Sequence, residues 1–149
     1  MALQQQVMEQ MKVAMKARDK TALEALRAIK SALLLAQSEA GRKEGLSEEA
    51  EVKLVQKLVK QRKDSATIFK EQGRDDLVEP ELAQVAVIEQ FLPEQLSEEE
   101  IEKVVDRSIA TTGASGMEDM GKVMGIVSKE LAGRADGKTI STIVKKKLA

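Results

Sequence analysis

Residues 117–149 read MEDMGKVMGIVSKELAGRADGKTISTIVKKKLA, and this stretch is the clearest guide to the fold. Apolar side chains recur in its first half at alternating steps of three and four, which places them on one face of a helix. Lys122 and Lys129 fall on the opposite face. The stretch therefore predicts an amphipathic helix whose apolar face is formed by Met117, Met120, Met124, Val127 and Leu131.

Signals at both ends bound this helix and predict a second one. Ser115 followed by Glu118 is a capping-box pattern, and Gly133 is a typical left-handed stop. Asp136 can cap a second helix whose apolar face consists of Ile140, Ile143, Val144 and Leu148. The expected connection is only residues 133–135, so the two helices should form a tight antiparallel hairpin.

Glycines inside this hairpin point to close contacts with the backbone. Gly121 and Gly125 lie within the first helix, where each costs about 1 kcal/mol relative to alanine. A close approach to the backbone, by another helix or by a ligand, would offset this cost. Gly121, Gly125 and Gly133 are therefore candidate close-approach positions.

The composition predicts an all-α protein and excludes most common catalytic sites. The chain has 24 basic and 25 acidic residues, almost no aromatic residues, no cysteine and no histidine. It therefore cannot form a Cys/His zinc site, a Ser-His triad or a Cys-His pair. We expect no metal, no cofactor and no catalytic residue of its own. The lack of cysteine and of a long apolar run predicts a cytoplasmic protein that is neither secreted nor membrane-spanning.

Helical signals also run through the first part of the chain. Asp19 and Ser47 are expected N-caps, and Gly73 is expected to end the third helix. A shorter helix is expected from about Glu79 to Leu92, with Pro80 in its first turn. The four expected apolar faces are Leu3, Val7, Met11 and Met15; Leu23, Leu26, Ile29, Leu33 and Ala36; Val52, Val55, Leu58, Val59, Ala66 and Phe69; and Leu82, Val85, Ile88 and Leu92.

The chain is expected to divide after the fourth helix. Ser97 and Glu100 form a capping box that begins a new helix directly after a proline-containing segment. We expect an N-terminal domain of about four helices at 1–92, a linker at 93–96 and a three-helix tail domain at 97–149. The tail has a size at which an isolated core is marginal.

Several segments together resemble the GatB/YqeY family. The tail contains MGKVMG at 120–125 and GRADG at 133–137, followed by a lysine-rich terminal helix. Three upstream segments are similar to the YqeY pattern in order: LRAIKSAL at 26–33, KQRKDSATIFKEQGRDDL at 60–77 and FLPEQLSEEEI at 91–101. The chain therefore resembles the free-standing YqeY-like proteins over nearly its whole length.

This resemblance implies two helical domains, of which the tail is shared with the B subunit of the tRNA-dependent amidotransferase. In that protein the tail helps to hold the tRNA, and similar modules are appended to some glutaminyl-tRNA synthetases. The implied partners are tRNA, an aminoacyl-tRNA synthetase or an amidotransferase subunit. The chain lacks the Ser-Ser-Lys amidase signature. Any activity as a carbon–nitrogen ligase with glutamine as amido-N donor would therefore come from a partner subunit.

Basic side chains of the tail are the first candidates for contact with RNA phosphates. From Gly116 onward, seven basic residues face four acidic ones. Lysines also suit a helix C-terminus through the macrodipole, and surface lysines commonly serve only to solvate the protein, so a structural interpretation stays open. The seven residues are Lys122, Lys129, Arg134, Lys138, Lys145, Lys146 and Lys147.

Arg134 is the sharpest of these candidates. It lies in the expected connection, beside a helix N-terminus whose free N–H groups favour anions, and its planar guanidinium suits a phosphate. Asp136 competes for the same N–H groups, and Arg134 has the alternative roles of pairing with Asp136 or closing the preceding helix. The family resemblance favours the RNA-binding role.

A second basic group lies along the third expected helix and just past its end. Its first members lie at helical spacing, and because Glu49 can pair with Lys53, ordinary exposed ion pairs are the main alternative. The group consists of Lys53, Lys57, Lys60, Arg62, Lys63 and Arg74.

Arg27 and Lys30 interrupt a stretch of core-facing residues in the second expected helix. They either border a groove, meet acidic partners such as Glu24 or Glu51, or extend their charged ends into solvent along apolar surface.

Two functions follow from these patterns. The first is a non-catalytic RNA-handling module that contacts phosphates and shape, since Phe69 and Phe91 sit on apolar faces and are unsuited to base stacking. The second is a protein-interaction module in which the glycine-flattened helix packs against a partner. RNA binding through lysines should weaken steeply with salt, whereas an apolar protein interface should not. An independent enzyme is disfavoured, because no activated nucleophile or base is recognisable.

Overall fold

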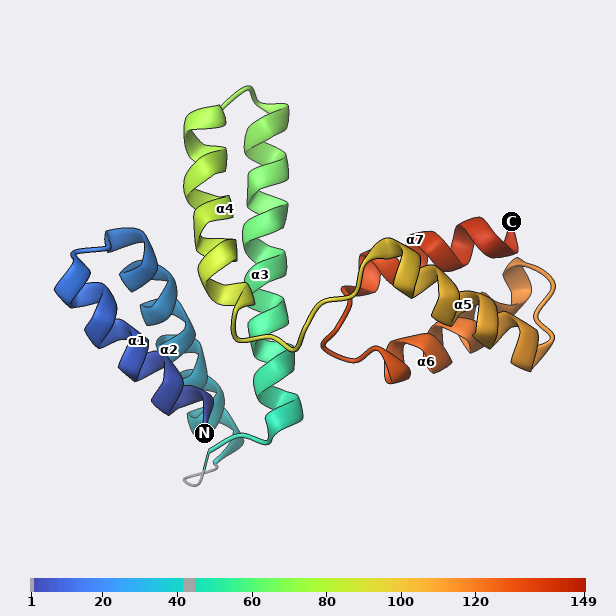
Figure 1. The fold of residues 1–149 in the computed structure, drawn as a ribbon, viewed down its shortest axis with the longest axis horizontal. Coiled ribbons are helices and arrows are strands. Elements are labelled where there is room, and N and C mark those ends of the chain that lie inside the picture. Colours follow the sequence, from blue (N-terminus) through green and yellow to red (C-terminus); the bar gives the residue numbers. More distant parts are fainter. Residues whose placement is uncertain (1, 42–44) are drawn as a thin grey trace. The chain divides into compact units, whose positions relative to one another are not determined.

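The structure is a computed structural model that describes residues 2–41 and 45–149, and within these ranges it contains helices and no strand. This confirms the expected all-α class. Two compact units divide the chain, Met1–Leu92 and Pro93–Ala149. The helices, coloured along the chain in Figure 1, are α1 Leu3–Ala17, α2 Lys20–Ala40, α3 Glu48–Glu71, α4 Asp75–Glu89, α5 Glu98–Thr112, α6 Met120–Glu130 and α7 Gly137–Leu148, with a 3₁₀ turn, η1, at Met117–Asp119.

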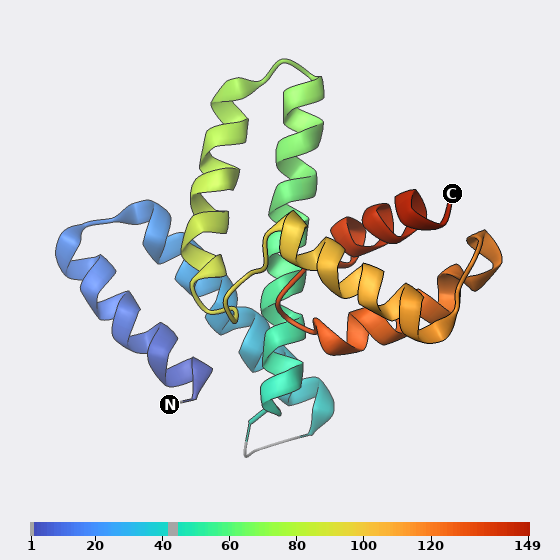
Figure 2. The ribbon, with the colours of Figure 1, turned by 45° about the vertical axis from the view of Figure 1, so that its right-hand side comes forward.

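The first unit consists of two helical hairpins. Helices α1 and α2 form one, α3 and α4 form the other, and α2 also packs against α4 (Figures 1 and 2). Asp19 and Ser47 cap α2 and α3 as predicted, each accepting a hydrogen bond from a backbone N–H. Apolar residues at helical spacing form the core, which includes Val7, Leu26, Ile29, Leu33, Val55 and Ile88.

The start of α4 and two core positions differ from the sequence-based expectation. The helix begins at Asp75, one turn earlier than predicted, and Pro80 lies inside it. Two acidic residues in the first turn complement the helix dipole, and Pro80 removes only one donor near the exposed start, so the proline does not define the boundary. The predictions for Met15 and Leu82 were also wrong, because these side chains are 52% and 48% exposed.

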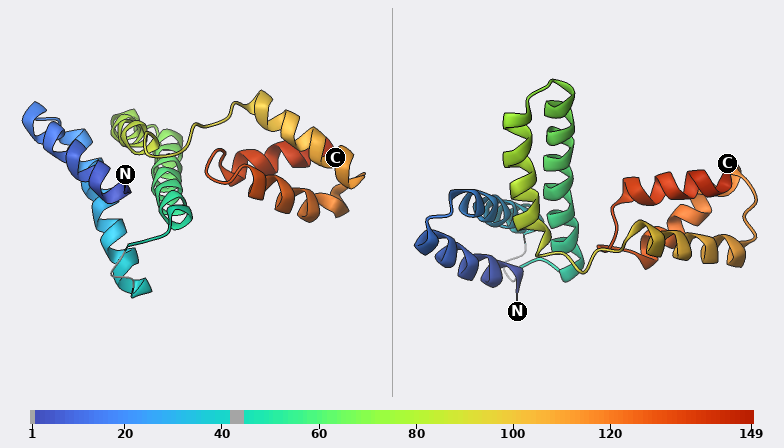
Figure 3. Two further views of the ribbon diagram at one scale, coloured as in Figure 1. Left: turned by 60° about the horizontal axis from the view of Figure 1, so that its bottom comes forward. Right: turned by 45° about the horizontal axis from the view of Figure 1, so that its top comes forward.

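The second unit is a three-helix bundle in which α5, α6 and α7 all contact one another (Figure 3). The Ser97 capping box forms as predicted, with Ser97 and Glu100 each accepting from the other's backbone N–H. Asp136 caps α7. The core of this unit consists of Ile101, Val105, Val123, Val127, Leu131, Ala135, Ile140, Ile143, Val144 and Leu148.

The beginning and end of α6 required correction. The predicted capping box at Ser115 and Glu118 is wrong, because Asp119 instead accepts from the Ser115 N–H at 3.1 Å and residues 117–119 form the 3₁₀ turn. This turn leaves Met117 43% exposed, and Val123, which was not predicted, is fully buried. Helix α6 also ends at Glu130, so the connection to α7 is longer than the expected 133–135.

Candidate nucleic-acid interface

The connection between α6 and α7 carries Arg134 on a backbone fixed by hydrogen bonds. The Arg134 N–H donates to the Leu131 carbonyl at 2.8 Å, and Gly133 adopts the left-handed conformation expected of it, with φ of 80°. On the other side, the Leu96 N–H donates to the Arg134 carbonyl at 2.9 Å, and the Gln95 side-chain amide donates to the Gly133 carbonyl at 2.7 Å. These bonds define the backbone of the turn, and Arg134 is exposed on it.

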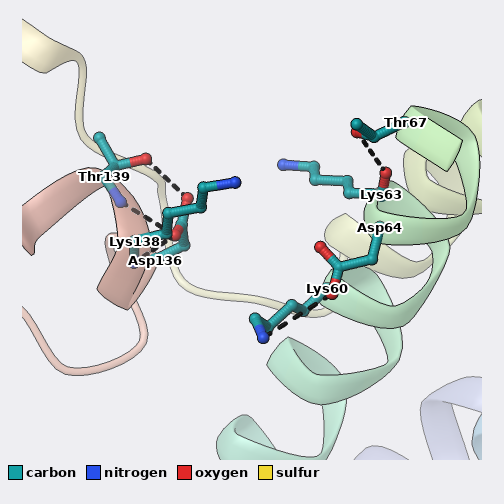
Figure 4. A network of polar contacts seen from close by, with 7 residues as sticks. All are labelled: Lys60, Lys63, Asp64, Thr67, Asp136, Lys138 and Thr139. Carbon is teal, nitrogen blue, oxygen red and sulfur yellow. Dashed lines mark hydrogen bonds and ion pairs between the residues drawn. The ribbon is translucent and has the colours of Figure 1, made fainter. Parts of the chain in front are cut away.

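Asp136 occupies the N-terminus of α7. Its Oδ1 accepts from the backbone N–H groups of Lys138 at 2.8 Å and Thr139 at 3.1 Å, and its Oδ2 accepts from the Thr139 hydroxyl at 2.7 Å (Figure 4). A carboxylate therefore already satisfies the N–H groups that would otherwise attract an anion. Any anion contact at this turn would fall to the Arg134 side chain rather than to the helix end.

The Arg134 side chain has no structural partner in the described ranges. No ion pair joins its guanidinium to a carboxylate there, and the bond that closes the α6 end uses its backbone N–H, which any residue except proline supplies. Neither structural alternative thus accounts for an arginine at this position.

Five lysines of α6 and α7 share this exposed and unpaired state. A spacing of seven residues places Lys122 and Lys129 on one face of α6, and Lys138 and Lys145 on one face of α7. Among the described residues, no ion pair involves these four or Lys146, whereas Lys147 pairs with Asp106 at 3.5 Å. The remaining tail arginine, Arg107, pairs with Glu130. From Gly116 onward the tail therefore presents six unpaired cations: Lys122, Lys129, Arg134, Lys138, Lys145 and Lys146.

The α6 glycines leave helix backbone uncovered. A Cβ atom at Gly121 or Gly125 would meet no atom of the described chain within 4 Å, and both residues are exposed. No other helix of the described chain therefore makes the expected close approach, while approach by a ligand or partner stays a prediction. Lys122 and Ile126, which is 42% exposed, follow these two glycines in the sequence.

Five basic residues of α3 and the start of α4 bond to their own unit. Four ion pairs form: Lys53 with Glu49 at 3.3 Å, Lys60 with Asp64 at 3.7 Å (Figure 4), Lys63 with Glu89 at 3.1 Å and Arg74 with Asp76 at 3.0 Å. The Arg74 hydrogen bond lowers the pKa of the Asp76 carboxyl. Arg62, half-buried, donates to the Gln84 side chain at 2.8 Å and to the Leu58 carbonyl at 3.1 Å. These contacts favour a structural role.

Arg27, Lys30 and Lys57 make no ion pair within the described residues. The suggested acidic partners have other contacts. The Gln84 side chain donates to Glu24 at 3.5 Å, and Glu51 accepts from the Leu3 N–H, while burial raises the pKa of the Glu51 carboxyl.

The described residues contain no cluster of three or more potential metal ligands among His, Cys, Asp and Glu. No helix in the same ranges combines the length and hydrophobicity needed to cross a membrane.

Comparison with known protein families identifies the family of this chain. The model of the family described as "Yqey-like protein" matches residues 4–148. The chain belongs to this YqeY-like family.

Three relatives show how the YqeY-like chain compares with larger proteins. It is 38% identical over 84 residues to the E subunit of the glutamyl-tRNA(Gln) amidotransferase of Thermococcus gammatolerans, which covers 54% of this chain and 13% of that protein. It is 46% identical over 48 residues to the same protein of Methanococcus maripaludis, covering 32% of this chain and 8% of the relative. It is 33% identical over 127 residues to the altered inheritance of mitochondria protein 41, mitochondrial, of Pyrenophora tritici-repentis, covering 84% of this chain and 68% of that protein. The YqeY-like chain thus spans only a small part of its amidotransferase relatives.

Sequence reasoning identified the exposed cations of the YqeY-like tail but missed the residues that fix the Arg134 turn. Gln95 and Leu96 were assigned to a linker, yet they hydrogen-bond to the turn across 38 sequence positions. The only available signal was an amide side chain next to the tail's first cap, which is too common to predict a partner.

Proposed function

We propose that this YqeY-like protein is a non-catalytic accessory module that binds tRNA through residues 97–149. The observation that carries the proposal is the set of six exposed cations from Gly116 onward that have no carboxylate partner in the described chain. Such side chains gain sequence-independent affinity for nucleic acids by displacing counterions from phosphates. The tail is proposed to contact phosphates along the exposed face of α6 and at the Arg134 turn.

The chemistry of the chain favours folded RNA over unpaired bases. Its two aromatic residues, Phe69 and Phe91, are half-buried, and Phe91 packs against the core of the first unit. Stacking platforms for unpaired bases require exposed aromatic rings, whereas helical RNA is recognised through phosphates, hydroxyls and shape. The uncovered backbone at Gly121 and Gly125 would let an RNA backbone approach α6 beside Lys122.

The names of two relatives support the same class of ligand. Both are E subunits of a glutamyl-tRNA(Gln) amidotransferase, a name that includes a tRNA. Since this chain corresponds to 13% or less of each, the proposal takes over the tRNA setting and leaves the amide-transfer chemistry to a partner subunit. A cytoplasmic location stays a prediction.

The test is a fluorescence titration with total tRNA at two salt concentrations. The variant Lys122→Ala/Arg134→Ala should bind more weakly than the wild type and show a salt dependence reduced by up to about two units of log slope. Its thermal stability should change little, because exposed substitutions usually stay within about 0.5 kcal/mol. The matched control Lys53→Ala/Arg74→Ala removes one lysine and one arginine that are ion-paired in the first unit, and it should bind like the wild type.

Two outcomes would remove the RNA proposal. One is a wild-type protein that does not bind tRNA at low salt, and the other is equal binding by the wild type and the Lys122→Ala/Arg134→Ala variant. If that variant unfolds, Arg134 is a structural residue and the turn has no proposed RNA role.

A protein partner is the second candidate, favoured by the apolar character of the same helix. Ile126 and Met117 are 42% and 43% exposed, and no described atom covers Gly121 or Gly125. This surface would suit another helix, such as one from an amidotransferase subunit or an aminoacyl-tRNA synthetase. Its complex should be nearly insensitive to salt, and residues 97–149 used as bait should capture it.

A further inference from the structure

We infer that Gln95 is a positioning residue for Arg134, through hydrogen bonds that tie the segment before α5 to the turn between α6 and α7. The inference rests on the proposed function, since it concerns how the tail presents one of its RNA-binding side chains. Gln95 itself is not expected to touch RNA.

Gln95 uses its side-chain amide to join two backbone segments of the second unit. Its Nε2 donates to the carbonyl of Pro93 at 2.7 Å and to the carbonyl of Gly133 at 2.7 Å. The next residue continues the pairing, because the Leu96 N–H donates to the Arg134 carbonyl at 2.9 Å. Residues 95–96 thus support two successive carbonyls of the turn.

The turn's own backbone supplies one hydrogen bond at this point, from the Arg134 N–H to the Leu131 carbonyl, so the contacts of residues 95–96 add to its support. Gly133 is buried and adopts a left-handed conformation, and a glycine samples both signs of φ readily. Without the Gln95 donor, the Gly133 carbonyl loses a bond in a partly buried place, which favours other conformations of the turn. Arg134 follows directly, so its guanidinium would sample a wider range of positions and bind a phosphate less tightly.

RNA binding and the hydrogen bonds from residues 95–96 to the turn must favour each other. If the 95–96 contacts favour the RNA-binding arrangement of the turn, then bound RNA must favour those contacts by the same free energy. The Leu96 amide reports on this directly, because its hydrogen exchange requires the bond to the Arg134 carbonyl to open.

The experiment is a double-mutant cycle in the full chain, with total tRNA as the probe. Gln95→Ala should weaken binding roughly 2- to 10-fold, the range expected for one hydrogen bond. In the Arg134→Ala background the same change should have almost no further effect, because it acts through Arg134. Gln90→Ala is the matched control, since Gln90 is exposed at the end of α4, and it should bind like the wild type.

A second variant tests the hydrogen bond itself. Gln95→Glu has nearly the same shape but places carboxylate oxygens against two carbonyl oxygens, so it should weaken binding more than Gln95→Ala. Gln90→Glu controls for the added negative charge. In both Gln95 variants the Leu96 amide should exchange faster than in the wild type, and saturating tRNA should slow its exchange in the wild-type protein.

The results separate the two proposals. If Arg134→Ala weakens binding while Gln95→Ala does not, or if their losses simply multiply, the positioning role is wrong and the RNA role stands. If Gln95→Ala unfolds the tail in thermal melts, Gln95→Asn, with the amide one methylene shorter, takes its place in the cycle. If the wild type does not bind tRNA, the proposed function has failed. Unchanged hydrogen exchange of the Leu96 amide in Gln95→Ala would show that Gln95 does not support the turn either.

Discussion

The basic residues of α3 and of the α6–α7 hairpin have similar chemistry but different surroundings. Along α3 and at the start of α4, Lys53, Lys60, Lys63 and Arg74 pair with carboxylates of the same unit and Arg62 donates to an amide and a carbonyl, while Lys57 makes no ion pair within the described residues. From Gly116 onward, six of the seven cations have no such pair within the described chain. A lysine count therefore does not identify a site, whereas the location of its counter-charges does.

The tail cations are unpaired because the local carboxylates have other roles. From Gly116 onward there are four acidic residues. Asp119 accepts from the Ser115 N–H, Glu130 pairs with Arg107 of α5, and Asp136 caps α7. Three of these four carboxylates thus help to end or join helices, which leaves fewer local counter-charges for the basic residues of α6 and α7.

The largest expected effect compares the cores beneath these two surfaces. Leu33→Ala and Leu131→Ala remove side chains that are 1% and 2% exposed, so each should destabilise its own unit by about 2–5 kcal/mol. At a temperature where both variants stay folded, only Leu131→Ala should weaken tRNA binding, because looser packing at Leu131 would shift the backbone carbonyl that accepts from the Arg134 N–H. Thermal unfolding and titration are measured on the same samples. Loss of binding in Leu33→Ala alone would move the interface to the first unit.

Charge reversal tests whether the unpaired cations of the tail matter more for binding than the paired cations of the first unit. Lys122→Glu/Lys129→Glu/Arg134→Glu changes three unpaired cations, and the loss of three phosphate contacts near 0.1 M salt should weaken tRNA binding on the order of 100-fold.

The control for this reversal carries the same change in net charge on the first unit. Lys53→Glu/Lys60→Glu/Arg74→Glu replaces three paired cations and should weaken binding less than about threefold, with a modest loss of stability from new like-charge neighbours. Equal losses in the two triple variants would show that overall charge, and not the tail surface, governs binding.

Local patterns in the sequence were sufficient for most of the fold. Asp19, Ser47 and Asp136 cap helices as predicted, since capping depends on residues within one turn. The same local logic failed at Ser115, where Asp119 forms the competing bond, and at Pro80, where a helix continues through a residue typical of its start.

The candidate site was predicted less completely, for a physical reason. The sequence identifies which residues are basic and which helix face they occupy, but pairing depends on contacts such as Lys63 with Glu89 or Arg107 with Glu130, which join different helices. The bond from Gln95 to Gly133 is of the same kind. Spacing in one helix predicts local pairs such as Lys53 with Glu49, but it carries no information about partners on another helix.

A smaller effect separates folding from binding at α6. Gly125→Ala adds a methyl group that meets no described atom within 4 Å, so it should stabilise the unit by about 0.5–1 kcal/mol through helix propensity. If RNA or a partner helix approaches the backbone there, the same methyl group should weaken binding. Thermal unfolding and tRNA titration should thus change in opposite directions. A variant that is more stable and binds tRNA normally would place the interface away from this part of α6.

The smallest expected effect concerns Glu51, whose negative charge slightly lowers the stability of the first unit at neutral pH. Burial, and secondarily the nearby Glu48 charge, raises the pKa of Glu51 above its ordinary value of 4.5, although the Leu3 N–H acts in the opposite direction. The folded state therefore favours the protonated carboxyl. This contribution to stability is fully present below pH 4.5 and is lost as the pH rises through the raised pKa of the folded state.

Glu51→Gln should consequently be more stable than the wild type at pH 7, because the amide carries no charge and its oxygen can still accept from Leu3. The advantage should be less than about 0.5 kcal/mol, since the site is largely solvated, and it should shrink as the pH falls through the raised pKa of the folded state towards 4.5. Glu49→Gln removes the partner of Lys53 and should have a small effect of the opposite sign. Denaturant unfolding at pH 7 and pH 4 measures both variants. A gain for Glu51→Gln that is equal at the two pH values would show that packing of the amide, and not removal of the charge, is responsible.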